Sequence, residues 1–218
     1  MSADSTRKGM PRQSHSKRGM ELEGYVTGAC RTYRNRGEAL IVKIATPFRN
    51  VGGRMEYDEE GNGRWAMGRA IPDPHADTAV DYVGIRHRHY PVGFDCKESH
   101  VALRFDLDRV DDEQVRYMND FEQMGGVCFL LIRQVDGPGR EAIHLLPFRA
   151  FYRFWEEAGR ARLVGSRPGG ARQSIPIDEI RRWPQANAGR GVVVDFLPAL
   201  DRALTQWEMA NGQPYRVV

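Results

Sequence analysis

The order of hydrophobic patterns in this chain of 218 residues predicts an α/β fold, with a mixed central β-sheet flanked by helices. Three observations support this prediction: a helical periodicity opens the body of the chain, strand-like runs and turns fill its middle, and helical patterns return after the most apolar run. Hydrophobic residues make up 41% of the chain, which is enough to bury a core and excludes a wholly disordered protein. The longest apolar run, Val127 to Ile132, is far shorter than the roughly 20 residues of a membrane span. We therefore expect a cytoplasmic protein without a membrane partner.

The first part of the body predicts a helix, a strand and a long arm. Apolar residues recur at helical spacing over 20–35, and Gly37 follows as a stop. Residues 39–44 are typical of a buried strand. The stretch 48–78 is rich in glycine and proline, and we interpret it as a protruding hairpin or long arm.

The second part alternates strands and helices. Two short strand-like runs around Arg88 suggest a hairpin, and Asp111 or Asp112 can cap a helix that Gly125 and Gly126 end. Further strands are expected at 80–85, 89–95, 101–107, 127–135 and 141–146. Helices are expected at 148–158 and 178–183 and from Pro198 onward, with a loop at 159–173 and a run at 192–196 that leads into the last helix.

The hairpin around Arg88 holds the residues that point to chemistry. Without a bulge, it places Asp81 directly opposite Asp95, where like charges destabilise the pair unless something compensates them. A divalent cation would compensate, because hard cations such as Mg²⁺ prefer carboxylate oxygens. Lys97 follows on the same face of the strand. Two carboxylates and an ammonium suit phosphodiester hydrolysis, in which metal ions activate water and stabilise developing charge.

Other interpretations of these residues stay open. The same spacing fits a surface hairpin with solvated carboxylates and a lysine that pairs with one of them. His87 and His89 are expected in a solvated basic turn, and Cys96 on the face opposite Asp95. The aromatic residues of 148–158 are expected in the core. Three scattered cysteines without CxxC spacing predict neither disulfides nor a zinc site and suit a reducing cytoplasm.

The positive charge of the chain is concentrated at its start. Residues 1–18 contain five basic residues against Asp4, a net charge of +4, so the rest of the chain carries −1. This segment is polar and lacks periodicity, which indicates a disordered arm able to neutralise phosphates, although an ordinary solubilising terminus has the same composition. The residues of the arm expected to bind DNA are Arg7, Lys8, Arg12, Lys17 and Arg18.

Several separate segments together resemble one known family. They are RGMELE at 18–23, ATP at 45–47, VDYVGI at 80–85, FDCKES at 94–99, EQVRYM at 113–118, GGVCFLLI at 125–132 and GGARQSI at 169–175. Over about residues 18–200 the chain resembles the RecU family of Holliday junction resolvases, which belongs to the PD-(D/E)xK nuclease superfamily. The resemblance implies a restriction-endonuclease-like nuclease domain over 19–218, with 48–78 as a stalk-like insertion.

The resemblance also implies roles for single residues. Asp81 and Asp95 resemble the two metal-binding acids, with Mg²⁺ as cofactor and Mn²⁺ as a substitute, and Lys97 resembles the active-site lysine. Gln114 resembles the glutamine that completes the metal shell. Glu23 resembles the acid of the first helix, a supporting acid near the metal, and a solvated glutamate at a helix start fits that position equally well.

The chain departs from the family pattern at two places. Ala79 stands where the family has a threonine, and the interval between the two acids is one residue longer, so a bulge or a longer hairpin tip must absorb it. In the family, the segment that corresponds to 48–78 enters the open centre of a four-way junction. Its tip is acidic here, so its flanks are expected to meet DNA through Arg49, Arg54, Arg64 and Arg69.

The function implied by the resemblance is a metal-dependent endonuclease that resolves four-way DNA junctions by symmetric nicks in homologous recombination and DNA repair. Two opposed nicks require two sites related by a two-fold axis, which implies a homodimer. Recombinase or branch-migration proteins are further expected partners. Two alternatives stay open: a catalytically weak junction-binding or recombinase-modulating protein, favoured by Ala79, and a restriction-like nuclease that acts on ordinary duplex.

Overall fold

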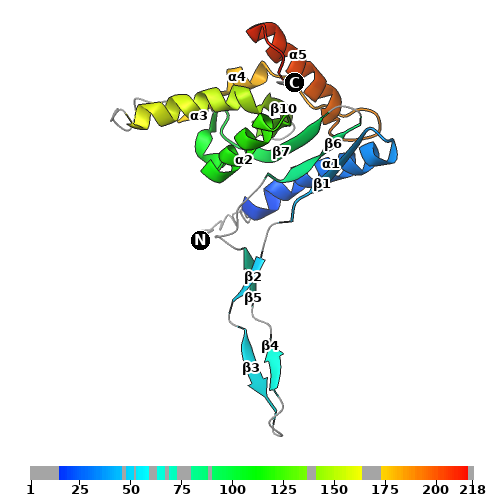
Figure 1. The fold of residues 1–218 in the computed structure, drawn as a ribbon, viewed down its shortest axis with the longest axis vertical. Helices are drawn as coiled ribbons and strands as arrows, with labels where there is room; N and C mark the ends of the chain where they lie inside the picture. The colour runs from blue at the N-terminus through cyan, green and yellow to red at the C-terminus, as the bar shows by residue number, and fades with distance from the viewer. Residues whose placement is uncertain are drawn as a thin grey trace, which may run out of the picture.

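A five-stranded mixed sheet forms the centre of the molecule (Figure 1). The computed structural model describes residues 15–45, 48–51, 53–58, 63–66, 69–72, 80–87, 90–136, 141–163 and 173–215. In spatial order the strands are β1 (Ala39–Lys43), β6 (Tyr82–Arg86), β7 (Pro91–Ser99), β9 (Val127–Val135) and β10 (Glu141–Pro147). Strands β7 and β9 run parallel and the other pairs of this sheet run antiparallel. The predicted mixed α/β class is confirmed.

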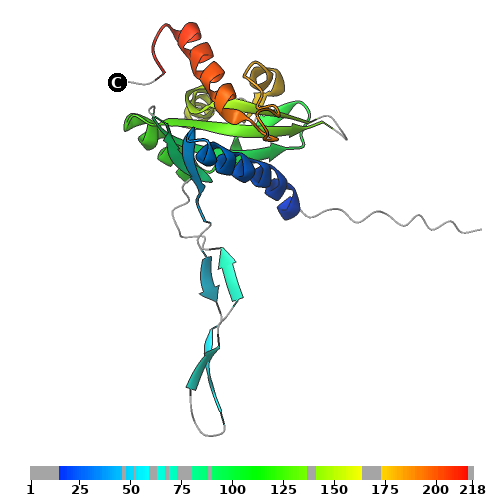
Figure 2. The same ribbon diagram turned by 90° about the vertical axis from the view of Figure 1, so that its right-hand side faces the viewer.

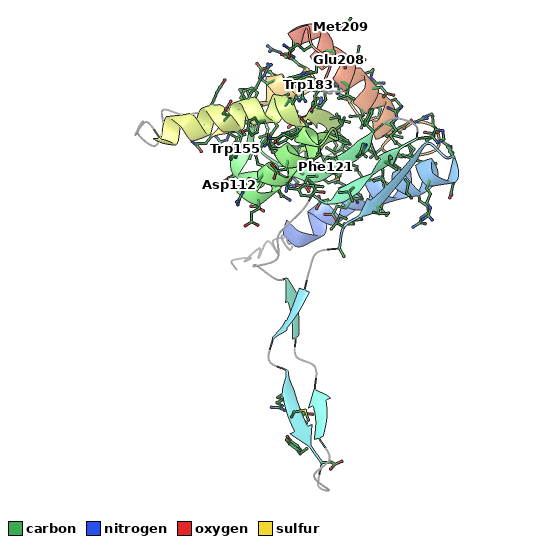
Figure 3. The ribbon with its side chains drawn as sticks, in the orientation of Figure 1. Asp112, Phe121, Trp155, Trp183, Glu208 and Met209 are labelled. Atoms are coloured by element: carbon green, nitrogen blue, oxygen red, sulfur yellow. The ribbon has the colours of Figure 1, made fainter. Side chains whose placement is uncertain are left out.

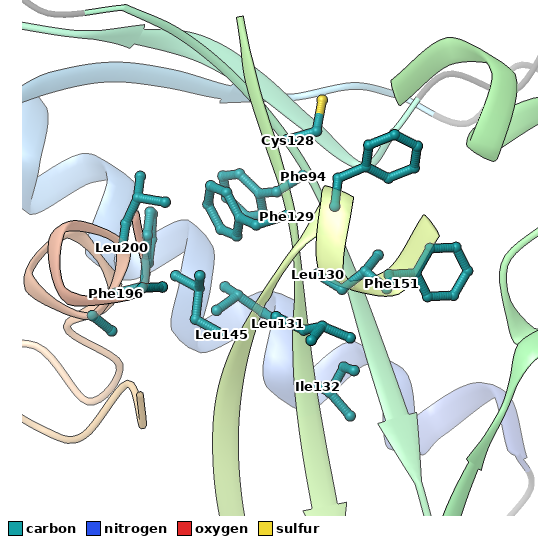
Figure 4. Close-up of a cluster of buried hydrophobic side chains, with 14 of the residues drawn as sticks. Phe94, Cys128, Phe129, Leu130, Leu131, Ile132, Leu145, Phe151, Phe196 and Leu200 are labelled. Carbon is teal, nitrogen blue, oxygen red and sulfur yellow. The ribbon is translucent and has the colours of Figure 1, made fainter. Parts of the chain in front are cut away.

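Two pairs of helices cover the two faces of the sheet. Helices α1 (His15–Asn35) and α5 (Phe196–Asn211) lie on one face, and α2 (Asp112–Gln123) and α3 (Phe148–Leu163) lie on the other. On the first face the ring of Phe94 in β7 stacks on that of Phe129 in β9, with 4.5 Å between the ring centroids (Figure 4). The ring of Phe196 lies beside Phe94 with a centroid distance of 5.1 Å. On the second face Gly93 lies against Phe121 of α2. Aromatic packing of this kind adds to the stabilisation by buried area.

Helix α1 follows from the spacing of its apolar residues. Leu22, Val26 and Tyr33 are buried along one side, and Gly37 ends the helix with a φ of +68°, which glycine adopts without strain. The helix begins at His15. The expectation that the basic arm is disordered up to residue 18 is therefore wrong for 15–18, while residues 1–14 lie outside the described part of the chain.

Strand β1 is an edge strand rather than the buried strand that its composition predicted. Ala39 and Ile41 are buried under α1, whereas Leu40 and Val42 are each 48% exposed. The alternate residues face the side of α2, and that helix packs mainly on β9 and β7. The result is an exposed aliphatic strip on β1 and β6, which consists of Leu40, Val42, Ile44 and Ile85.

A two-part antiparallel hairpin occupies the stretch between β1 and β6. Near the body β2 (Phe48–Val51) pairs with β5 (Arg69–Pro72), and farther out β3 (Arg54–Tyr57) pairs with β4 (Gly63–Ala66). Figures 1 and 2 show this hairpin projecting away from the sheet and its helices.

Short elements complete the fold and correct two predictions. The strand expected at 101–107 is only β8 (Arg104–Asp106), followed by the 3₁₀ turn η1 (Leu107–Arg109), and Leu103 is exposed. The loop expected from residue 159 is helical as far as Leu163, because α3 continues. Strand β11 (Ser174–Pro176) pairs with β8 and precedes α4 (Ile177–Arg181). Within the described ranges, no helix has the length and apolar character needed to cross a membrane.

Candidate active site

The hairpin of β6 and β7 has the register that the sequence predicted. Tyr82 pairs with Phe94 and Ile85 with Pro91 in an unbroken antiparallel ladder, which brings Asp81 against Asp95. The chain closes the tip with a hydrogen bond from the Arg86 amide to the Tyr90 carbonyl at 3.1 Å. The paired part of this hairpin contains no bulge.

The two carboxylates are held in place by backbone amides. The amide of Asp81 donates to Asp95 Oδ1 at 3.2 Å, and the amide of Cys96 donates to Asp81 Oδ2 at 2.9 Å. Asp95 is fully buried and Asp81 is half-buried. Burial, together with the neighbouring Asp95, raises the pKa of Asp81 to about 8. A cation between the two groups would remove this penalty and keep both ionised.

Helix α2 brings a glutamine to the lysine of the site. Lys97 Nζ lies 2.6 Å from Asp95 Oδ2 and donates to Gln114 Oε1 at 3.1 Å. Gln114 is in the first turn of α2 and is 7% exposed. Asp81, Asp95, Lys97 and Gln114, which the sequence analysis selected, therefore lie together on the α2 side of the sheet.

The donor set of this site fits a hard divalent cation. Asp95 Oδ2 is buried and receives no hydrogen bond from a described residue; its charge is met by Lys97. Mg²⁺ is commonly bound by one or two carboxylates together with waters and substrate phosphate. The described part of the chain contains no group of three or more His, Cys, Asp or Glu residues placed to hold a metal. By their opposed positions and the buried Oδ2, Asp81 and Asp95 are the carboxylates that would hold the ion.

Gln114 stays a predicted ligand. Its Oε1 accepts hydrogen bonds from both Lys97 and the Asp111 amide, which uses both lone pairs of the oxygen. It would join a metal shell only by releasing one of these two donors.

Glu23 pairs with a lysine that the sequence analysis did not select. Its carboxylate forms an ion pair with Lys43 at the end of β1, and Tyr82 Oη donates to its carbonyl at 2.9 Å. The hydrogen bond to Glu23 and the charges of Glu23 and Asp81 raise the pKa of Lys43. The sequence contains one feature that could have identified Lys43 as the partner of Glu23: it is a lysine at the end of an otherwise aliphatic strand.

A charged cluster supports the site from the opposite face of β7. Arg133 of β9 is buried and contacts Glu98 at 3.1 Å, Glu21 at 3.0 Å and Glu141 at 2.5 Å. Glu98 follows Lys97 directly, so the cluster joins Glu21 of α1 to the strand that holds the lysine. Cys96 also faces this side, where it packs against the core as expected.

The cavity beside the site does not suit DNA. It measures about 850 Å³. It lies between the first turn of α2 and the second half of α3, where Figure 3 labels Asp112 and Trp155. Five acidic residues line it, and they disfavour phosphate: Asp108, Asp111, Asp112, Glu113 and Glu156.

The predicted DNA-binding arginines belong to the projecting hairpin and the arm. Arg54 is exposed and pairs with Glu56 at 2.8 Å. In the register Val51 lies opposite Arg69 and Glu56 opposite Arg64. Among the residues that the sequence analysis named, some lie in described backbone but have side chains outside the described part: Arg49, Arg64, Arg69, Lys17 and Arg18. Others lie wholly outside it: Arg7, Lys8, Arg12, Ala79 and His89.

Comparison with known proteins identifies the family. Residues 17–202 match the model of the family described as Recombination protein U. A Holliday junction resolvase RecU from Limosilactobacillus fermentum is 30% identical over 88% of this chain and 82% of its own length. Another from Staphylococcus saprophyticus is 31% identical over 76% and 70%. The solved structure of the Holliday junction resolvase Hjc from Archaeoglobus fulgidus matches 60% of this chain and 73% of its own, at 10% identity and a TM-score of 0.33. The chain belongs to the Recombination protein U (RecU) family.

Proposed function

We propose that this protein is a metal-dependent endonuclease that resolves four-way DNA junctions by symmetric nicks in recombination and repair. The observation that carries the proposal is the pair of opposed acids, Asp81 and Asp95, with the ammonium of Lys97 beside them. Membership of the RecU family supports the same activity, because the similar proteins from Limosilactobacillus and Staphylococcus are named Holliday junction resolvases.

Each side chain of the site has a distinct task in phosphodiester hydrolysis. Asp81 and Asp95 would hold Mg²⁺, with Mn²⁺ as a substitute and Gln114 as a third ligand. When bound, such an ion activates a water and neutralises charge on the phosphate. Backbone amides fix the two carboxylates before DNA arrives, and Lys97 keeps a positive charge at the place where phosphate charge develops.

The symmetric reaction requires a second copy of the chain. Two opposed nicks need two sites related by a two-fold axis, and a homodimer provides them. The exposed aliphatic strip lies on the face of the sheet that also holds Asp81. Because it is apolar and carries no charge, the same strip on a partner complements it. We therefore include in the proposal a homodimer that contacts through the strip.

The remaining parts of the proposal concern DNA contact and location. The hairpin flanks would meet the junction through Arg49, Arg54, Arg64 and Arg69, and the basic arm would add attraction that does not depend on sequence. Cys30, Cys96 and Cys128 are unpaired, which suits the reducing cytoplasm proposed as the location.

Cleavage of a synthetic four-way junction tests the proposal. The protein is incubated with the junction and with a linear duplex of the same arm sequence, each with Mg²⁺ and each with EDTA. We expect paired nicks on opposed strands of the junction with Mg²⁺ only. Equal cutting of the linear duplex would indicate a restriction-like nuclease, and tight junction binding without nicks would indicate a junction-binding protein; either result contradicts the proposal.

A further inference from the structure

Two hydrogen-bond donors converge on one oxygen of Gln114. Lys97 Nζ donates to Gln114 Oε1 at 3.1 Å, and the backbone amide of Asp111 donates to the same atom at 3.3 Å. An ammonium and a backbone N–H can donate but not accept. If the carboxamide of Gln114 were flipped, its NH₂ group would face two donors, so the two partners together determine which way it points.

Asp111 has this position because it begins helix α2. It is the N-cap residue, with φ −66° and ψ 148°, and Gln114 is the third residue of the helix. The two form a capping box, in which the Asp111 carboxylate accepts from the Gln114 amide and the Gln114 side chain accepts from the Asp111 amide. Gln114 is 7% exposed, so water has little access to replace a lost partner.

We propose that Asp111 is a positioning residue of the nuclease site. Its backbone N–H holds the Gln114 oxygen toward Lys97, and Gln114 in turn holds the Lys97 ammonium against Asp95 Oδ2 at 2.6 Å. The start of α2 thereby sets the position of a side chain on β7. This inference rests on the proposed function and adds a residue that lines the neighbouring acidic cavity and is none of the proposed metal ligands or DNA contacts.

A proline substitution removes the proposed donor while preserving the backbone. The φ of Asp111 is −66°, which proline adopts, and Val110 before it has φ −115° and ψ 114°, the extended region that a residue before proline prefers. Asp111→Pro therefore deletes both the N–H and the carboxylate. Asp111→Ala deletes the carboxylate alone and is the matched control. Asp111→Asn keeps both the backbone N–H and a side-chain oxygen that can accept from the Gln114 amide.

The measured quantities are kcat and KM for junction nicking, with melting temperature as a check of folding. We expect Asp111→Pro to lower kcat about fivefold below Asp111→Ala, the effect of one lost hydrogen bond, with KM unchanged. Asp111→Asn should restore the wild-type kcat. In a Gln114→Leu background Asp111→Pro should cause no further loss, because the contact it breaks is already absent.

Two results would overturn the inference. One is an equal kcat for Asp111→Pro and Asp111→Ala, and the other is an undiminished effect of Asp111→Pro in the Gln114→Leu background. If the proline variant does not fold, Gln114→Leu is compared with wild type in kcat and in Mn²⁺ affinity: the inference requires a lower kcat with unchanged KM and unchanged Mn²⁺ affinity, and a parallel loss of Mn²⁺ affinity would overturn it. Failure of the proposed function is recognised separately, because the wild-type protein would then leave the junction uncut with Mg²⁺.

Discussion

The backbone amide of Asp81 donates a hydrogen bond to Asp95 Oδ1 over 3.2 Å. This contact follows from the register of β6 and β7, and it holds two acids opposite each other in a place where at least one carboxylate is fully buried. The arrangement costs folding free energy when both groups are ionised and no cation is bound. A site with this cost has consequences that stability measurements can detect.

The first prediction is a pH-dependent stabilisation by Asp81→Asn. The pKa of Asp81 is raised from its ordinary value of 3.8 to about 8, chiefly by burial. The folded protein therefore keeps a proton that the unfolded chain releases, and stability falls as pH rises through this window. With EDTA present, Asp81→Asn should melt above wild type near pH 8, and the difference should shrink toward pH 4. A difference in melting temperature that stays constant with pH would contradict the account.

The second prediction separates Glu23 from the metal ligands. Its carboxylate is paired with Lys43, and both side chains are partly exposed, so Glu23→Gln should lower the free energy of unfolding by less than about 1 kcal/mol. Calorimetric titration with Mn²⁺ should give an affinity unchanged within about twofold, whereas Asp95→Asn should lose at least about tenfold. A tenfold loss for Glu23→Gln would show that Glu23 binds the ion.

The third prediction tests the close contact of β1 and β6. A Cβ at Gly84 would lie 2.2 Å from the Leu40 carbonyl oxygen and 2.6 Å from Ile41 Cα, so the strands must separate to admit it. Gly84→Ala should lower the free energy of unfolding in urea by about 1 to 3 kcal/mol. Gly28→Ala is the control, because nothing lies within 4 Å of its Cβ and alanine favours the helix. Equal effects of the two substitutions would contradict the described pairing.

The fourth prediction concerns the basic arm. Replacing Arg7, Lys8 and Arg12 by alanine should flatten the slope of log affinity against log salt by up to about 3 per chain, since each phosphate contact contributes roughly 0.9. Preference for the junction over linear duplex should survive. Alanine at Ser2, Ser5 and Ser14 serves as a neutral control. An unchanged slope would assign the arm no role in DNA binding, and a lost preference would place junction recognition in the arm.

Local patterns were sufficient to predict several parts of this structure. The register of Asp81 and Asp95 follows from alternation and from the position of the tip, and the cap at Asp111 and the stop at Gly37 follow from local backbone chemistry. These features depend on residues within a few positions of one another or on a single hairpin. The sequence could therefore identify the acids and the lysine of the candidate site.

Features that depend on distant packing were not predictable in this way. The exposure of Leu40 and Val42 depends on how far α2 extends over the sheet. No residue pattern within β1 indicates the extent of that helix. The ion pair of Glu23 with Lys43 joins a helix to a strand through tertiary structure. The donation from Lys97 to Gln114 likewise requires α2 to lie over β7, which the order of elements alone does not specify.

The most direct test measures nicking and junction affinity in the same preparation of Asp95→Asn. The account predicts that nicking with Mg²⁺ falls below detection, because a buried ligand of the ion is lost, while junction affinity is unchanged or rises with the loss of a negative charge. Lys97→Ala should behave in the same way, and Asp120→Asn, an exposed acid on α2, should match wild type in both measurements. Nicking by Asp95→Asn at the wild-type rate would contradict the assignment of this site.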